Sequence, residues 1–93
     1  MIPLDPVTKT NGHTYTLVKR TPTAAIYRQS GGKGDATAYE VIVINVRDAE
    51  TIMGREYPAR EVYPNMNDWG TLGWTYTGPN GLELAEKKFA SIA

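Results

Sequence analysis

Hydrophobic and polar positions alternate along the first third of the chain in the pattern of β-strands. Within residues 13–19, Tyr15 and Leu17 fall on one face, while threonines and Val18 fall on the other. Threonine, tyrosine and valine are favoured on pleated surfaces, so this run predicts a strand. A second short strand is predicted at residues 24–29, after a break at Pro22.

The strongest predicted strand covers residues 38–46, because it is apolar on both faces. One face carries Tyr39, Val41 and Val43, and the other carries Ile42, Ile44 and Val46. Such a strand lies centrally and is covered on both sides. One short helix covers a single face, so we expect the other face to be covered by residues 47–73 or by a second copy of the chain. We therefore predict a homodimer.

The C-terminal part predicts a last strand and one helix. Residues 74–77 have strand composition, and Asn80 with Glu83 approximates a capping box. The apolar residues that follow recur with helical spacing at Leu82, Ala85, Phe89 and Ile92. Residues 47–64 show no clear period and are expected to form an irregular edge strand or a loop crossing the sheet. The predicted fold is α+β, with an antiparallel sheet of three to four strands packed on one C-terminal helix.

Composition narrows the class of protein. A chain of 93 residues is expected to form a single domain, residues 1–93, with residues 1–12 as an N-terminal arm. The absence of cysteine excludes disulfides, thiolate zinc sites and cysteine nucleophiles. The sequence shows no signal peptide, and its longest aliphatic run is residues 41–44. We expect a soluble, cytoplasmic protein that does not associate with membranes.

The net charge is zero, but the charges are unevenly distributed. Residues 1–33 carry five basic residues against one acidic residue, and residues 34–62 carry three against six. A neutral chain has no overall field that attracts phosphates. A surface with one basic and one acidic region suits a charged protein partner. The same distribution also arises where basic and acidic residues neutralise each other on the sheet.

Few residues offer catalytic chemistry. His13 is the only histidine, and neither Ser30 nor Ser91 stands in a nucleophile-elbow context. The glycine-rich residues 31–34 lack the ending of a phosphate-binding P-loop. The spacing of the glutamates in residues 50–61 does not resemble a calcium-binding loop. We therefore expect no enzyme activity, no cofactor and no metal.

Aromatic residues concentrate in the second half of the chain. Trp74 and Tyr76 are expected to fill the core beneath the helix. Trp69 follows the polar run of residues 65–68 and is the aromatic residue most expected to be exposed. Exposed aromatic side chains near basic ones are typical of binding hot spots. The predicted binding residues are Lys19, Arg20, Arg28, Lys33, Tyr57, Tyr63 and Trp69.

One run of motifs also resembles a known group of proteins. Residues 57–64 read YPAREVYP, and Trp69-Gly70, Gly73-Trp74-Thr75-Tyr76 and a helix containing Ala85 and Phe89 follow. This ending resembles short, uncharacterised open reading frames of bacteriophages and other mobile elements. The resemblance implies a compact protein that occludes a host protein, such as a nuclease of a defence system. No functional residue is carried over from this group.

Three hypotheses follow. The first is a non-catalytic phage or mobile-element protein that binds and blocks a host protein, as anti-CRISPR proteins do. The second is a nucleic-acid-binding module that uses the basic first hairpin and exposed aromatic residues. The third is a minor virion component or self-assembling structural protein.

Overall fold

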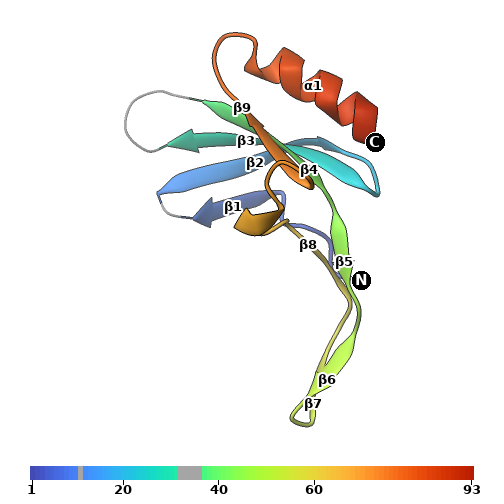
Figure 1. The fold of residues 1–93 in the computed structure, drawn as a ribbon. Coiled ribbons are helices and arrows are strands. Elements are labelled where there is room, and N and C mark those ends of the chain that lie inside the picture. The colour runs from blue at the N-terminus through green and yellow to red at the C-terminus, as the bar shows by residue number, and fades with distance from the viewer. Residues whose placement is uncertain (11, 32–36) are drawn as a thin grey trace.

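The computed structural model describes residues 1–10, 12–31 and 37–93, with the backbone alone at Met66. Five antiparallel strands form one sheet in the order β1-β2-β3-β4-β9, and one helix packs on it (Figure 1). The predicted α+β class, with a sheet on one C-terminal helix, is confirmed. The elements of this body are β1 (Val7–Thr10), β2 (His13–Arg20), β3 (Ala24–Gly31), β4 (Ala38–Val43), β9 (Gly73–Tyr76) and α1 (Gly81–Ile92).

The extra strand comes from the segment expected to be an arm. Residues of β1 pair with β2 in the register Val7↔Thr16 to Thr10↔His13. All four side chains of β1 are exposed, so the strand adds backbone hydrogen bonds to the sheet without adding to its core. An edge strand with no buried face carries no alternating apolar signal, which is why the sequence pattern did not reveal it.

The helix covers one face of the sheet, as the spacing of its apolar residues predicted. Ala85 and Phe89 pack on Ile26 and Val41 from the two central strands. Trp74, Tyr76 and Ile92 are among the partly buried residues at the edge of this cluster, so the expectation that Trp74 and Tyr76 lie beneath the helix is confirmed. Asn80 stands at the N-cap position as predicted, but its side chain makes no capping hydrogen bond, so the expected capping box is not formed.

The opposite face holds a second core, centred on Ile42 and Tyr27. Partly buried side chains from outside the sheet close over it, among them Leu4 from the N-terminal segment and Tyr63 from the segment before β9. The second face of the double-faced strand is therefore covered from within the same chain, which was one of the two expected explanations. Covering this face no longer requires a second copy, and dimerisation stays a prediction.

A narrow two-stranded ribbon projects from the body (Figure 1). Its base pairs β5 (Asn45–Arg47) with β8 (Arg60–Val62), and its outer part pairs β6 (Glu50–Ile52) with β7 (Arg55–Tyr57). Residues 47–64 were expected to be irregular. Pro58 lies between the two paired parts, and since proline cannot donate to a ladder, the pairing is interrupted there.

The chain leaves the sheet at Ile44, inside the run that predicted one strand over residues 38–46. Ile44 is buried and its N–H donates to the Thr23 carbonyl at 2.8 Å, next to the start of β3. Beyond this point no strand of the sheet remains to pair with, and Asn45–Arg47 pairs with β8 instead. Val46 is consequently exposed, although the alternation placed it on an apolar face.

A short 3-10 helix, η1 (Met66–Asp68), leads from the ribbon to β9. No helix among the described residues is long and apolar enough to cross a membrane.

Candidate functional site

A groove of about 930 Å³ opens on the sheet face opposite α1. It lies between the N-terminal segment, the first strands and the segment that follows the ribbon. The residues that shape it include Leu4, Tyr15, Tyr27, Glu40, Tyr63 and Trp69. Its volume is in the range of ligand sites, which measure roughly 300–1,000 Å³.

Three aromatic rings pack against one another along one side of the groove. Tyr63 meets Tyr27 edge-on, with ring centroids 5.6 Å apart, and stacks on Trp69 with centroids 6.1 Å apart. The Tyr27 hydroxyl donates to the Asp5 carbonyl at 2.7 Å, and the Trp69 indole N–H donates to Thr75 Oγ1 at 2.9 Å. Each polar tip is thereby satisfied and each ring is fixed in place.

Glu40 brings a carboxyl group to the groove. In the sheet it pairs with Tyr27 on β3 and with Thr75 on β9, and only 9% of its surface is exposed. The Tyr63 hydroxyl donates a hydrogen bond to Glu40 Oε2. Burial raises the pKa of Glu40 above its ordinary value, and the Tyr63 hydrogen bond and the charge of His13 partly offset this. The pKa of Tyr63 is raised by burial and by the same hydrogen bond, so its proton stays on the phenol.

The raised pKa of Glu40 gives a pH-dependent prediction. A carboxyl whose folded pKa lies above its unfolded value of 4.5 favours the folded state at low pH, and that advantage is lost as pH rises through the folded pKa. A glutamine amide in its place would accept the Tyr63 hydrogen bond without charge. We expect Glu40→Gln to match the wild type below pH 4 and to become progressively more stable relative to it as pH rises to 7. Thermal unfolding across this range measures the difference, and a constant difference would contradict the prediction.

Close packing of Trp69 on the backbone gives a second prediction. A Cβ atom built at Gly73 would lie 2.5 Å from Trp69 Cζ3, closer than any contact can be. We expect Gly73→Ala to displace the indole and to destabilise the fold by about 1–3 kcal/mol, as overpacking does. Thermal unfolding measures the loss. Gly70→Ala is no matched control because Gly70 has a positive φ of 95°, whereas Thr77→Ala changes an exposed side chain after β9 and should leave the indole in place.

An ion pair fastens the N-terminal segment and the ribbon base to the sheet. Arg20 forms a bidentate pair with Glu61, with two N–O distances of 2.6 Å, and the Leu4 N–H donates to Glu61 Oε1 at 3.0 Å. The Arg20 hydrogen bonds lower the pKa of Glu61 from 4.5 to about 2. Ile2 adds two backbone hydrogen bonds to the ribbon, one with Ala59 and one with Glu61. The Glu61 carboxylate and the backbone of Ile2 therefore hold this wall of the groove in place.

The predicted basic residues do not form one surface. Lys19 lies on the helix side, where it pairs with Glu86 at 3.8 Å and rests over the Phe89 ring. Arg28 is exposed and pairs with Tyr39 in the register of β3 and β4, whereas Arg20 is held by Glu61 on the groove side. A β-bulge between Leu17 and Lys19 changes which face the end of β2 presents. Lys33 lies outside the described residues. A single basic face on the first hairpin is therefore not observed.

The predicted aromatic residues divide into two places. Tyr63 and Trp69 come together in the groove, and Trp69 is 36% exposed. Tyr57 lies on the ribbon, where Arg55 approaches its ring at 6.0 Å from the centroid. Sequence reasoning missed Glu40, whose signal was present: it is the one acidic residue within the apolar run of residues 38–46, on the same face as Ile42.

The residues considered for catalysis are not assembled into a site. His13 begins β2, meets Tyr15 edge-on with centroids 6.5 Å apart, and has a buried Nδ1 without a hydrogen-bond partner in the described chain. Ser30 reaches only a backbone carbonyl, that of Thr14. Among the residues that the structure describes, no group of three metal-ligating side chains comes together.

Comparisons with known proteins do not add to this picture. No family model, curated protein or solved structure matches the chain.

Proposed function

We propose that this chain is a non-catalytic binding protein that recognises and occludes a partner protein through its projecting ribbon. The resemblance to phage and mobile-element reading frames makes a host protein, such as a defence nuclease complex, the proposed partner. The observation that carries the proposal is the tip of the ribbon. Its apolar side chains contribute nothing to the folded core and remain available for contact.

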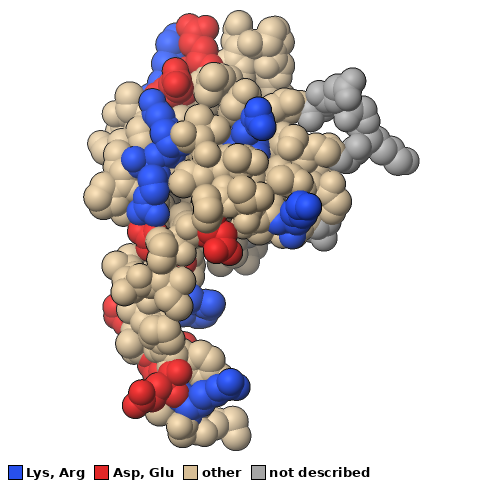
Figure 2. Space-filling view, turned by 180° about the vertical axis from the view of Figure 1, so that it is seen from behind, with Lys and Arg blue, Asp and Glu red and all other residues tan. Residues whose placement is uncertain are grey.

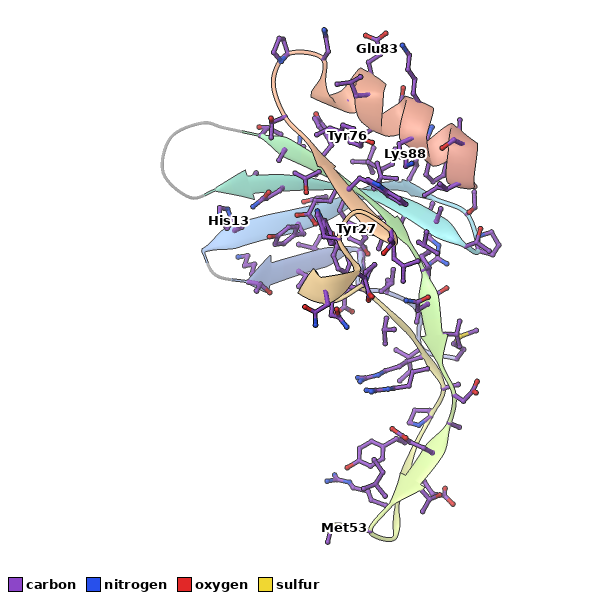
Figure 3. All side chains as sticks on the ribbon, viewed as in Figure 1. His13, Tyr27, Met53, Tyr76, Glu83 and Lys88 are labelled. Carbon is purple, nitrogen blue, oxygen red and sulfur yellow. The ribbon has the colours of Figure 1, made fainter. Side chains whose placement is uncertain are left out.

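The tip carries an exposed methionine in a conformation that is unfavourable for it. Met53 and Gly54 form the two-residue turn between β6 and β7, with φ angles of 52° and 79°. Such turns favour asparagine and glycine, and a methionine with positive φ costs about 1 kcal/mol. Met53 nevertheless stands fully exposed at the end of the ribbon (Figure 3). A residue that is poor for folding and prominent on the surface supports a role in contact.

Other exposed apolar side chains extend the contact surface along the ribbon. Ile52 and Tyr57 lie on the strands next to the tip, and Val46 lies near the base. An isolated two-stranded ribbon is marginally stable in water, because it has too little apolar surface to bury. Contact with a partner would bury more apolar surface, and removing apolar area from water is worth about 25 cal/mol per Å². The ribbon therefore gains order and affinity from the same contact.

The charges of the ribbon favour a protein over a nucleic acid. Basic and acidic side chains lie side by side along it (Figure 2), with arginines at 47, 55 and 60 and acidic residues at 48, 50, 56 and 61. A surface that follows a phosphate backbone needs an excess of positive charge. Interspersed charges instead set the register and orientation of a protein contact.

A substitution at the tip separates folding from binding. We expect Met53→Asn to leave the free energy of unfolding unchanged or to raise it by up to about 1 kcal/mol, because asparagine tolerates positive φ. The same change should weaken partner binding by about tenfold or more, because it removes the apolar tip. Unfolding and binding are measured on the same preparations.

The partner for this measurement is found by photo-cross-linking from position 53 in bacterial lysate. The matched control is the same cross-linker at Glu83 on the outer side of α1. A protein captured only from position 53, whose capture is prevented by excess unlabelled wild type added before irradiation but not by Met53→Asn, supports the proposal. Equal capture from both positions, or capture of nucleic acid whose binding weakens steeply with salt, contradicts it.

A further inference from the structure

We propose that the groove receives the guanidinium group of an arginine side chain from the partner protein, with Glu40 as its counter-ion. This inference rests on the proposed function, since it takes the groove as a second contact surface for the same partner protein. It concerns the groove and not the ribbon tip, so the two can be tested separately.

The balance of charge in the groove favours a cation. Among the described residues, three acidic ones line the groove, Asp5, Glu40 and Glu61, against one basic residue, Arg60. Glu61 is already paired with Arg20. Glu40 accepts a hydrogen bond from the neutral Tyr63 phenol, and in the described parts of the chain no lysine or arginine forms an ion pair with it. Buried carboxylates are normally paired with a cation, whereas in the described residues Glu40 has only the nearby charge of His13 and no ion pair.

The aromatic lining favours a planar, weakly hydrated cation. Tyr15, Tyr27, Tyr63 and Trp69 all line the groove, with Tyr63 packed against both Tyr27 and Trp69. Aromatic faces attract cations, and an arginine guanidinium both stacks on rings and pairs with a carboxylate through two parallel hydrogen bonds. Pro3 and Leu4 add apolar surface to the lining, which suits the methylene stem of the same side chain.

The position of the groove fits a partner that is held by the ribbon. Ile2 and Arg60 line the groove and also line a smaller hollow on the ribbon, next to Ile52 and Tyr57. The two surfaces are thus continuous at the ribbon base. A protein gripping the ribbon lies beside the mouth of the groove, and a side chain projecting from it reaches inside.

The test uses the Trp69 indole N–H as a reporter, because it sits in the groove and donates to Thr75. Nitrogen-15 spectra of the full chain are recorded during titration with N-acetylarginine amide, and Trp74→Phe assigns the two indole signals. The matched neutral probe is N-acetylcitrulline amide, which has the same shape without the charge. We expect the arginine probe to shift the Trp69 signal saturably and the citrulline probe to bind about tenfold or more weakly.

Two variants locate the interaction. Glu40→Gln should abolish the preference for arginine over citrulline, whereas Glu86→Gln on the helix side should keep it. Equal binding of the two probes to the wild type, or no response at Trp69, would overturn the inference without requiring any variant to fold.

The ribbon variant distinguishes this inference from the proposed function. Met53→Asn should lose the partner protein and still bind the arginine probe. If Met53→Asn loses the partner while the wild type ignores the arginine probe, the groove inference fails and the proposed function stands. If the arginine probe binds but partner capture does not depend on position 53, the proposed function fails.

Discussion

Replacing Arg20 with methionine is expected to destabilise the fold by about 1.5–3 kcal/mol, because it removes two charge-assisted hydrogen bonds from a partly buried ion pair. Only 9% of the Glu61 side chain is exposed, and Arg20 supplies both of its charged hydrogen bonds. Without Arg20 the carboxylate keeps the Leu4 N–H but has no counter-ion. The N-terminal segment and the ribbon base would loosen together. Denaturant unfolding measures the loss at pH 7.

The same variant changes how stability depends on pH. The folded pKa of Glu61 is about 2 against an ordinary value of 4.5, so its contribution is complete above the ordinary value and is lost as pH falls through about 2. We expect Arg20→Met to flatten the stability curve over this interval. The matched control is the double variant Arg20→Met with Glu61→Leu, which removes both charges and should recover much of the stability. An unchanged pH slope in Arg20→Met would show that the pair does not hold the fold.

Truncation of either core is expected to have the second large effect. Ile26 on the helix side and Ile42 on the groove side are both fully buried. Replacement of either by alanine should cost about 2–5 kcal/mol, from lost burial and from the cavity left behind. A domain of this length has a total stability of roughly 5–14 kcal/mol, so either change removes a large part of it.

The two truncations should differ in their effect on the groove. Ile42→Ala loosens the floor beneath Tyr27 and Tyr63 and should weaken binding of the arginine probe, whereas Ile26→Ala acts beneath α1 and should spare it. Ile52→Ala on the exposed ribbon is the control for stability and should change it by less than about 0.5 kcal/mol. If Ile42→Ala cost no more than Ile52→Ala, the second core would not contribute to the fold.

These expectations follow from the different ways in which the two faces of the sheet are closed. The helix side is closed by apolar packing of Ala85 and Phe89, with Lys19 and Lys88 resting over aromatic rings. The groove side is closed only in part, by segments that also carry polar groups and exposed rings. The site lies on the incompletely covered face because that is where side chains remain accessible.

Local patterns predicted the elements that bury a face. Strands β2, β3 and β4 and helix α1 were predicted from periods of two or of 3.6, and β9 from its composition. The predicted bounds lie close to the observed ones except at β4, which ends at Val43 and not at residue 46. Strand β1 and the outer part of the ribbon escaped prediction because their side chains are all exposed. An element that is held by backbone pairing alone leaves no hydrophobic period in the sequence.

The candidate site was predictable only in its components. Tyr63 and Trp69 were predicted to be binding residues from composition, but their stacking depends on the turn at residues 69–73. Arg20 was predicted to bind a partner and instead binds Glu61, which is 41 residues away in the sequence. No local pattern records that distance, because the ion pair forms only after the ribbon folds back to the end of β2.

The amino-acid sequence alone determined the α+β class, the double-faced central strand and the helix that covers one of its faces, because burial imposes a period that neighbouring residues share. Tertiary structure decided the rest: that the chain leaves the sheet at Ile44 to build a ribbon, that Glu40 meets Tyr63, and that the basic residues of the first hairpin part to opposite faces. Those outcomes depend on contacts between segments that are far apart in the sequence, at a strand edge or at a buried carboxylate. Such contacts exist only once the chain has folded, so no local pattern records them.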